Sequence, residues 1–117
     1  MKIESSVLKQ IIGNTVPPDP PDTFYKPACV FLLLFDKAEP HILAIQKSDT
    51  EGYPWRNQVA LPGGHVDKTD ASAVRAAYRE LEEEVNITEN QVEFAGSLGH
   101  FETIHQRSIE VFAGLWN

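Results

Sequence analysis

The 117-residue sequence contains little cysteine and little positive charge. Its single cysteine, Cys29, has no second cysteine for an internal disulfide, and its apolar neighbours predict a buried thiol rather than a reactive nucleophile. Ten basic residues against 17 acidic ones give a formal net charge of −7, which disfavours general nucleic-acid binding. An enzyme acting on a phosphorylated small molecule remains compatible, because bound divalent cations supply positive charge that the protein lacks.

Long hydrophobic runs are also missing. The longest, residues 28–35, is too short to span a bilayer, and no basic region followed by an apolar stretch marks a signal peptide at the N-terminus. We therefore expect a cytoplasmic protein without a membrane partner. The length and the ordinary composition, 42% hydrophobic and 23% charged, predict one globular domain over residues 1–117.

Three parts are expected along the chain. Apolar residues at helical spacing predict an N-terminal helix within residues 1–13, and five prolines make residues 14–27 an extended connector. The remainder, residues 28–117, forms the catalytic body. In it we expect strands over 28–35, 41–46, 58–61, 92–98 and 108–115, and one helix from Asp70, as N-cap, to residue 85, with Asn86 as its stop. Hairpins around a single helix favour an α+β, mixed-sheet fold.

The predicted helix concentrates glutamates that repel one another. At about 100° per residue, Glu80, Glu83 and Glu84 share one face, whereas Glu82 points to another side. Three carboxylates on one face provide the oxygen ligands that Mg²⁺ or Mn²⁺ prefers, and Arg79, four residues before Glu83, is placed to brace that carboxylate. The alternative is a solvated acidic helix face, an interaction surface without metal.

Two glycines precede this helix and strengthen the metal interpretation. Gly63 and Gly64 allow the backbone to approach a ligand closely. The segment from residue 64 to 87 resembles the Nudix box, G-x5-E-x7-R-E-U-x-E-E-x-G-U, where U is aliphatic. The positions that match are Gly64, Arg79, Glu80, Leu81, Glu83, Glu84 and Ile87.

The box departs from the pattern at three places. Asp70 stands where the first Glu belongs, eight residues rather than seven separate it from Arg79, and Asn86 replaces the late Gly. The first two departures resemble the branch of coenzyme A pyrophosphatases. That branch has an upstream signature, which residues 43–64 follow only in part, so coenzyme A itself is disfavoured as the substrate.

The resemblance implies a Nudix fold, a mixed sheet sandwiched between helices, that hydrolyses a nucleoside diphosphate linked to another moiety. By family precedent, Glu80, Glu83 and Glu84 would bind Mg²⁺ or Mn²⁺, and Glu83, Glu80 and Arg79 would form the catalytic set. Gly63 and Gly64 would shape the metal site.

Four further residues are candidates for contact with the substrate or with an additional metal ion. Trp55 and Arg56, in a polar loop, suit a base, sugar or phosphate, although loop aromatics also pack against their own domain. His65 follows the glycines and is a candidate for phosphate contact or, more ordinarily, for a structural hydrogen bond. Glu102 is the first candidate for an additional metal ligand or base.

The sequence ends directly after an apolar strand, whereas Nudix domains usually continue with another strand and a helix. We therefore expect that a C-terminal part is missing, and that an uncovered strand favours a homodimer. The alternative to a hydrolase is a Nudix-fold module that binds a nucleotide-type ligand for regulation with little or no turnover.

Overall fold

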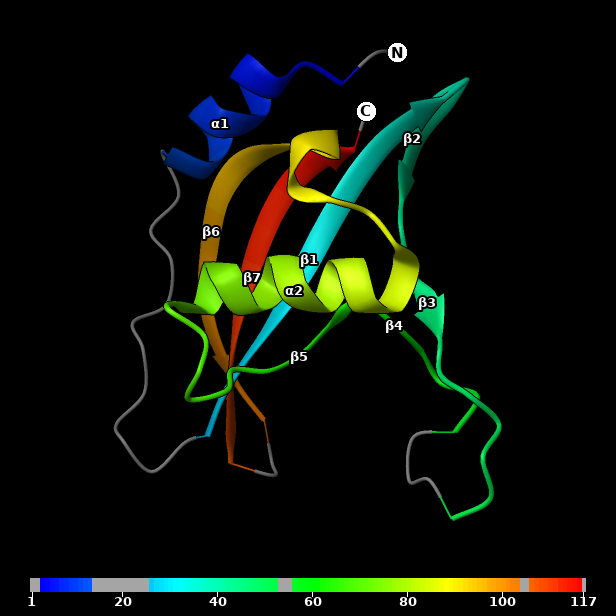
Figure 1. Ribbon diagram of the computed structural model, residues 1–117. Helices are drawn as coiled ribbons and strands as arrows, with labels where there is room; N and C mark the ends of the chain where they lie inside the picture. The colour runs from blue at the N-terminus through cyan, green and yellow to red at the C-terminus, as the bar shows by residue number, and fades with distance from the viewer. Residues whose placement is uncertain (1–2, 14–25, 53–55, 104–105, 117) are drawn as a thin grey trace.

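The computed structural model describes residues 3–13, 26–52, 56–103 and 106–116, and its elements are shown in Figure 1. In chain order they are α1 (Ser5–Gly13), β1 (Lys26–Lys37), β2 (Glu39–Ile42), β3 (Ile45–Gln46), β4 (Val59–Ala60), β5 (Gly63–His65), α2 (Ala73–Val85), the 3-10 helix η1 (Glu89–Gln91), β6 (Val92–Glu102) and β7 (Arg107–Trp116).

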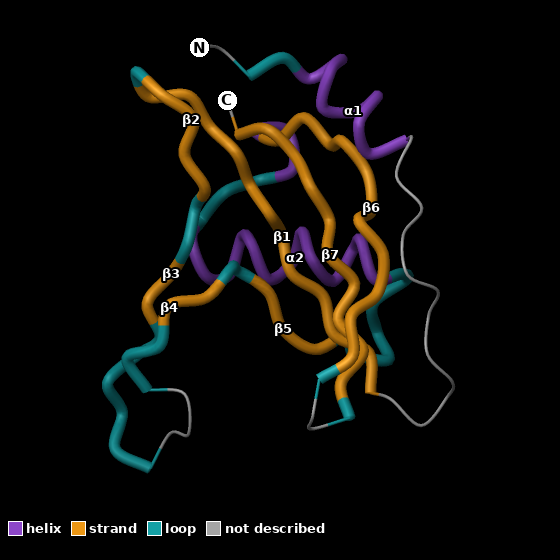
Figure 2. The backbone as a smooth tube through the Cα atoms, turned by 180° about the vertical axis from the view of Figure 1, so that it is seen from behind, coloured by secondary structure: helices purple, strands orange, loops and turns teal. Residues whose placement is uncertain are grey.

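The main sheet is mixed, as the sequence predicts. Its strand order is β2-β1-β7-β6, with β5 also paired to β1, while β3 and β4 form a separate two-stranded sheet. β1 and β7 are parallel, with Ala28 opposite Ile109, and every other pair is antiparallel. Helix α2 crosses one face of this sheet, which both views show (Figures 1 and 2). The predicted α+β, mixed-sheet fold is thereby confirmed.

The core lies between α2 and that face of the sheet. Alternate residues of β1, namely Cys29, Phe31 and Leu33, are completely buried, because successive side chains of a strand point to opposite faces. Leu81 and Tyr78 of α2 pack against them, with the Phe31 and Tyr78 rings 5.0 Å apart. The residues between these on β1 are half-buried, so the apolar run is fully covered on one face only.

The predicted strand over residues 41–46 is divided in the structure. β2 pairs with β1 as a hairpin, but β3 turns away and pairs with β4. The reason is that β5 occupies the rest of this edge of β1, with Val30 opposite Gly63 and the Phe31 N–H donating to the Pro62 carbonyl at 2.8 Å. Gly63 and Gly64, which lie beyond the strand predicted over residues 58–61, therefore belong to a strand of the main sheet.

The structure differs from the expectations for the N-terminal connector and for the final strand. Residues 14–25 of the predicted connector lie outside the described residues, and Lys26 and Pro27 already belong to β1. At the other end, β7 lies between β1 and β6, and Leu115 is buried. The expectation of an uncovered final strand, on which the homodimer was argued, is wrong for β7. No helix in the described ranges has the length and apolar character that a membrane crossing requires.

Candidate active site

The two glycines are built into the sheet beside β1, where neither position has room for a side chain. A Cβ on Gly63 would lie 2.1 Å from the Cys29 carbonyl oxygen and 2.7 Å from the Val30 Cα. A Cβ on Gly64 would lie 2.7 Å from the Glu80 carboxyl carbon. At Gly63 the obstacle is backbone, so glycine is required for β5 to lie against β1. At Gly64 the obstacle is the end of the Glu80 side chain, so glycine there allows this carboxylate to approach β5.

Two glutamates of α2 meet this glycine pair. Glu84 accepts a hydrogen bond from the Gly63 N–H at 2.8 Å, and the Glu80 carboxylate faces Gly64. Residues four apart share one face of a helix, so a single helix orientation delivers both carboxylates. Glu82 points to solvent, as predicted, and its neighbour Glu83 is also exposed.

Arg79 is the centre of an ion-pair network beside these carboxylates. Its Nε and Nη2 each donate to one oxygen of Asp70 at 3.0 Å, a bidentate arrangement. Its Nη1 donates to Glu80 at 3.0 Å and to Glu83 at 3.3 Å. The brace between Arg79 and Glu83 therefore exists, but Asp70 is the principal partner.

The role expected for Asp70 at the helix start is wrong. Ser72 is the N-cap of α2, and its hydroxyl accepts the Arg75 N–H at 3.3 Å. Asp70 lies two residues earlier, where it accepts the Asp67 N–H and binds Arg79. The serine competes for the cap as a residue of equal propensity, and the arginine is the stronger partner for a carboxylate. The predicted stop is confirmed, since Asn86 adopts the left-handed conformation with φ 58°.

The network shifts the acidity of its members in opposite directions. Hydrogen bonds from the Arg79 guanidinium hold the pKa of Asp70 below its usual value. Burial raises the pKa of Glu80 in spite of the opposing Arg79, because a charged carboxylate is disfavoured where water is excluded. Hydrogen bonding to Asp70 raises the pKa of Arg79, which stays charged.

Cys29 supports this arrangement from the core. Its thiol is completely buried and lies 3.7 Å from the Gly64 carbonyl oxygen, to which it donates. Burial raises the pKa of Cys29 to about 11. The prediction of a buried, unreactive thiol agrees with this environment.

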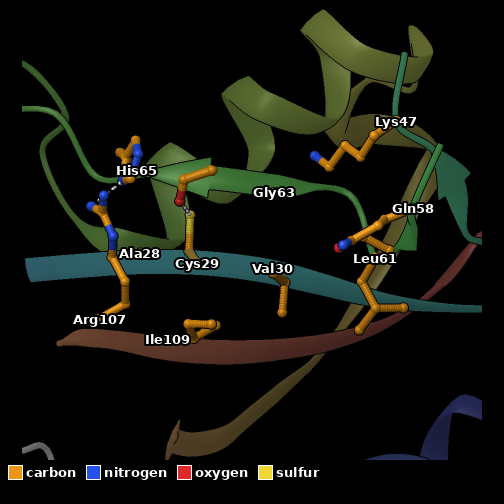
Figure 3. A pocket seen from close by; sticks show the side chains of 12 residues that line it. Ala28, Cys29, Val30, Lys47, Gln58, Leu61, Gly63, His65, Arg107 and Ile109 are labelled. Atoms are coloured by element: carbon orange, nitrogen blue, oxygen red, sulfur yellow. Dashed lines mark hydrogen bonds between the residues drawn. The ribbon is translucent and has the colours of Figure 1, made fainter. Parts of the chain in front are cut away.

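A cleft of about 480 Å³ lies beside the glycine pair (Figure 3). Ala28, Val30 and Ile109 form an apolar part of its lining, and the cationic side chains of Lys47 and Arg107 come from different elements. Lys47 also lies 3.7 Å from Glu84, which links the cleft to the carboxylates of α2. The volume and the mixture of apolar surface with few polar groups are typical of small-molecule sites.

Sequence reasoning did not propose Lys47 and Arg107 as site residues. Lys47 lies within residues 43–64, which follow the upstream signature only in part. Arg107 lies 42 residues from its hydrogen-bond partner His65, so no local pattern joins the two. Only the pairing of β1 with both β5, which carries His65, and β7, which carries Arg107, brings these two side chains into one cleft.

The remaining candidates are not gathered at the glutamates. Arg56 is exposed and pairs with Asp49 at 2.9 Å, and Trp55 lies outside the described residues. Glu102 is exposed at the end of β6. His65 does make a structural hydrogen bond, to Arg107 at 2.9 Å, but it also lines the cleft.

The carboxylates do not converge as a complete cage. Among the described residues, no three His, Cys, Asp or Glu side chains are grouped closely enough to hold a metal ion by themselves. Glu80 and Glu84 adjoin neighbouring residues of one strand, whereas Glu83 turns to Arg79. The protein therefore offers two close carboxylates and a third on the adjoining side of the helix.

Comparison of the sequence with known proteins identifies a family and a relative. The family model described as the NUDIX domain matches residues 25–114. The uncharacterized Nudix hydrolase NudL of Escherichia coli strain K12 is 36% identical over 91 residues, which cover 78% of this chain and 47% of NudL. The chain thus spans about half the length of the curated relatives it matches.

Solved structures share the fold. A C. elegans Ap4A hydrolase in a binary complex superposes with a TM-score of 0.65 at 25% identity, covering 77% of this chain and 65% of that one. RenU, a Nudix hydrolase from M. smegmatis, superposes with a TM-score of 0.61 over 78% of this chain and 61% of its own, but at 15% identity this shows the fold alone.

Proposed function

The chain belongs to the NUDIX domain family, and from this membership we propose that it is a metal-dependent pyrophosphohydrolase. Its substrate is a nucleoside diphosphate linked to another moiety, and the bond hydrolysed is that of the diphosphate. The observation that carries the proposal is the meeting of Glu80 and Glu84 with the Gly63–Gly64 backbone, which lines a cleft.

The donor set fits Mg²⁺ or Mn²⁺. Mg²⁺ is usually held by one or two carboxylates together with water and substrate phosphates, so a complete cage of protein ligands is not required. Glu80 and Glu84 provide the two close carboxylates and Glu83 the third, while Gly64 leaves the space that a Cβ would take from Glu80. When bound, such an ion acts as a Lewis acid towards the diphosphate oxygens.

The other residues position these groups and the substrate. Arg79 holds Glu80 and Glu83 in place and is itself fixed by Asp70. Either Glu80 or Glu83 takes the proton from the attacking water. Lys47, 3.7 Å from Glu84, adds a cation where the anionic diphosphate would enter. Gly63 and Gly64 shape the site, and His65 lines the cleft. We expect Arg56 and Trp55 to contact the nucleotide at the periphery of the site.

The first experiment tests metal dependence. The double variant Glu83→Gln, Glu84→Gln keeps side-chain size and leaves an amide oxygen to accept the Gly63 N–H, so folding is expected to persist. Hydrolysis with Mg²⁺ should fall at least 100-fold, and the rise in melting temperature that Mg²⁺ or Mn²⁺ gives the wild type should disappear. Glu82→Gln is the matched control, because it removes one charge from the solvent side of the same helix. Unchanged turnover in the double variant would refute the assignment.

The second experiment identifies the substrate. Nucleotide sugars, dinucleoside polyphosphates such as Ap4A, NADH, coenzyme A and oxidised nucleoside triphosphates are incubated with Mg²⁺, and phosphate-containing products are separated by ion exchange. Cleavage of coenzyme A would assign the branch that the extra residue before Arg79 resembles. Absence of cleavage of every compound, combined with tight binding of one, would favour the regulatory module over the hydrolase.

A further inference from the structure

Arg107 differs from the other arginines of this acidic protein in its partner. Each of the others forms an ion pair with a carboxylate: Arg56 with Asp49, Arg75 with Glu89, and Arg79 with Asp70. Among the described residues, Arg107 has no such carboxylate. Its side chain is bonded instead to the His65 ring, with Nη1 and Nδ1 2.9 Å apart. The half-buried guanidinium of Arg107 is therefore available to an anionic ligand.

The neighbours of Arg107 increase this positive charge. Lys26 is its register partner on the adjacent parallel strand, and partners in register share one face of a sheet. Because arginine only donates hydrogen bonds, His65 accepts through Nδ1, and the neutral ring carries its proton on Nε2. The remaining N–H groups of Arg107 and the Nε2–H of His65 are donors without a described acceptor. A planar guanidinium binds a phosphate oxyanion through two such N–H groups, and the bond to His65 fixes the orientation of the Arg107 guanidinium.

The position of this pair in the cleft defines what it recognises. Figure 3 shows Arg107 and His65 pointing toward one another at one end, with Lys47, Gln58 and Leu61 at the other end and the Ile109 and Val30 side chains between. Lys47 marks the diphosphate end, because it adjoins Glu84. An anion at Arg107 therefore lies at the opposite end of the cleft from Lys47, with apolar side chains between them.

We propose that Arg107 and His65 form a subsite for a phosphate monoester that the substrate carries at a distance from the diphosphate. The inference rests on the proposed function and deepens it. The preferred substrates are then nucleoside diphosphate compounds with one additional phosphate monoester, and the uncharged part between the two anionic ends lies over Ala28, Val30 and Ile109.

The test uses pairs of compounds that differ only in this phosphate. kcat/KM is measured for NADPH against NADH and for coenzyme A against dephospho-coenzyme A, with wild type, Arg107→Gln and Arg107→Lys. For at least one pair the wild type should prefer the phosphorylated member by tenfold or more. Arg107→Gln should reduce this preference to about twofold or less while changing kcat/KM for the unphosphorylated member less than threefold. Arg107→Lys should keep part of the preference, since it retains charge without the planar fork.

Arg75→Gln is the control for net charge, because Arg75 is bonded to Glu89 outside the cleft. No preference in wild type for either pair, an unchanged preference in Arg107→Gln, or an equal loss in Arg75→Gln would each overturn the subsite.

A calorimetric arm separates failure of the subsite from failure of the hydrolase. In EDTA, adenosine 2′,5′-bisphosphate, adenosine 3′,5′-bisphosphate and AMP are each titrated into wild type and into Arg107→Gln, and their affinities are compared. If no compound is hydrolysed, the proposed activity is wrong, but tighter binding of a bisphosphate by wild type and not by Arg107→Gln still supports the subsite. Equal affinities for AMP and both bisphosphates would overturn it.

Discussion

A single methyl group added at Gly63 or at Gly64 is expected to separate folding from activity. The two glycines are adjacent, yet an added Cβ meets different obstacles. At Gly63 it meets backbone, 2.1 Å from the Cys29 carbonyl oxygen, which is about 1.3 Å short of the 3.4 Å at which ordinary contact begins. At Gly64 it meets the end of the Glu80 side chain at 2.7 Å, a deficit of about 0.7 Å.

The energetic consequences follow from what is able to move. For Gly63→Ala, β5 must separate from β1, and we expect a loss of about 3 kcal/mol or more, the upper range for overpacking. For Gly64→Ala, rotation of the Glu80 side chain costs about 1 kcal/mol, offset by about 0.4–1 kcal/mol from the lower entropy of the unfolded chain. At about 4 °C per kcal/mol, Gly63→Ala should lower Tm by about 12 °C or more and Gly64→Ala by less than about 4 °C.

The Gly64→Ala variant is expected to fold but to lose most of its activity. Displacing the Glu80 carboxylate by about 0.7 Å breaks its alignment with Arg79 and with the metal site, and misplacement on this scale costs on the order of 100-fold in rate. Differential scanning fluorimetry with and without Mg²⁺, together with turnover, measures both properties. The reasoning is refuted if Gly64→Ala is as unstable as Gly63→Ala, or if it folds and turns over like wild type.

Three further predictions concern pH and stability in the absence of metal. Burial raises the folded-state pKa of Glu80, so the stability that its protonated form contributes is lost as pH rises from 4.5 through that pKa. The Glu80→Gln variant should therefore melt at a higher temperature than wild type at pH 7 and at no higher temperature below pH 4. We expect this variant to be inactive. The lowered pKa of Asp70 has the opposite sign, so Asp70→Asn should be less stable than wild type at pH 7, and acid titration of Tm should bring the two together as pH falls below 3.8. The Cys29 pKa of about 11 against 9.0 unfolded means that wild type should lose stability between pH 9 and 11 more steeply than Cys29→Ala, and iodoacetamide should label the thiol only after unfolding.

Several elements could be predicted because local physics determines them. The helix face shared by Glu80 and Glu84 follows from the 3.6-residue period, and the stop at Asn86 follows from the tolerance of asparagine for the left-handed conformation. The burial of Cys29 follows from its apolar run. Each of these depends on residues within about one turn or one strand.

The errors arise where two residues or segments compete for one partner. Asp70 and Ser72 are both good N-caps, and the choice depended on Arg79, nine residues beyond Asp70, whose bidentate contact holds the aspartate. The strand over residues 41–46 was divided because β5 competes for the same edge of β1. Propensity cannot express such competition, since the competing segment is distant in sequence.

By itself the sequence determined the Nudix box and the helix face shared by Glu80 and Glu84, because each is set by spacing along the chain. Tertiary structure alone decided that Gly63 and Gly64 form a strand wedged between β1 and Glu80, that Lys47 joins Glu84, and that Arg107 meets His65. The physical reason is that strand pairing brings together residues far apart in the chain, and no local pattern records which edges will meet.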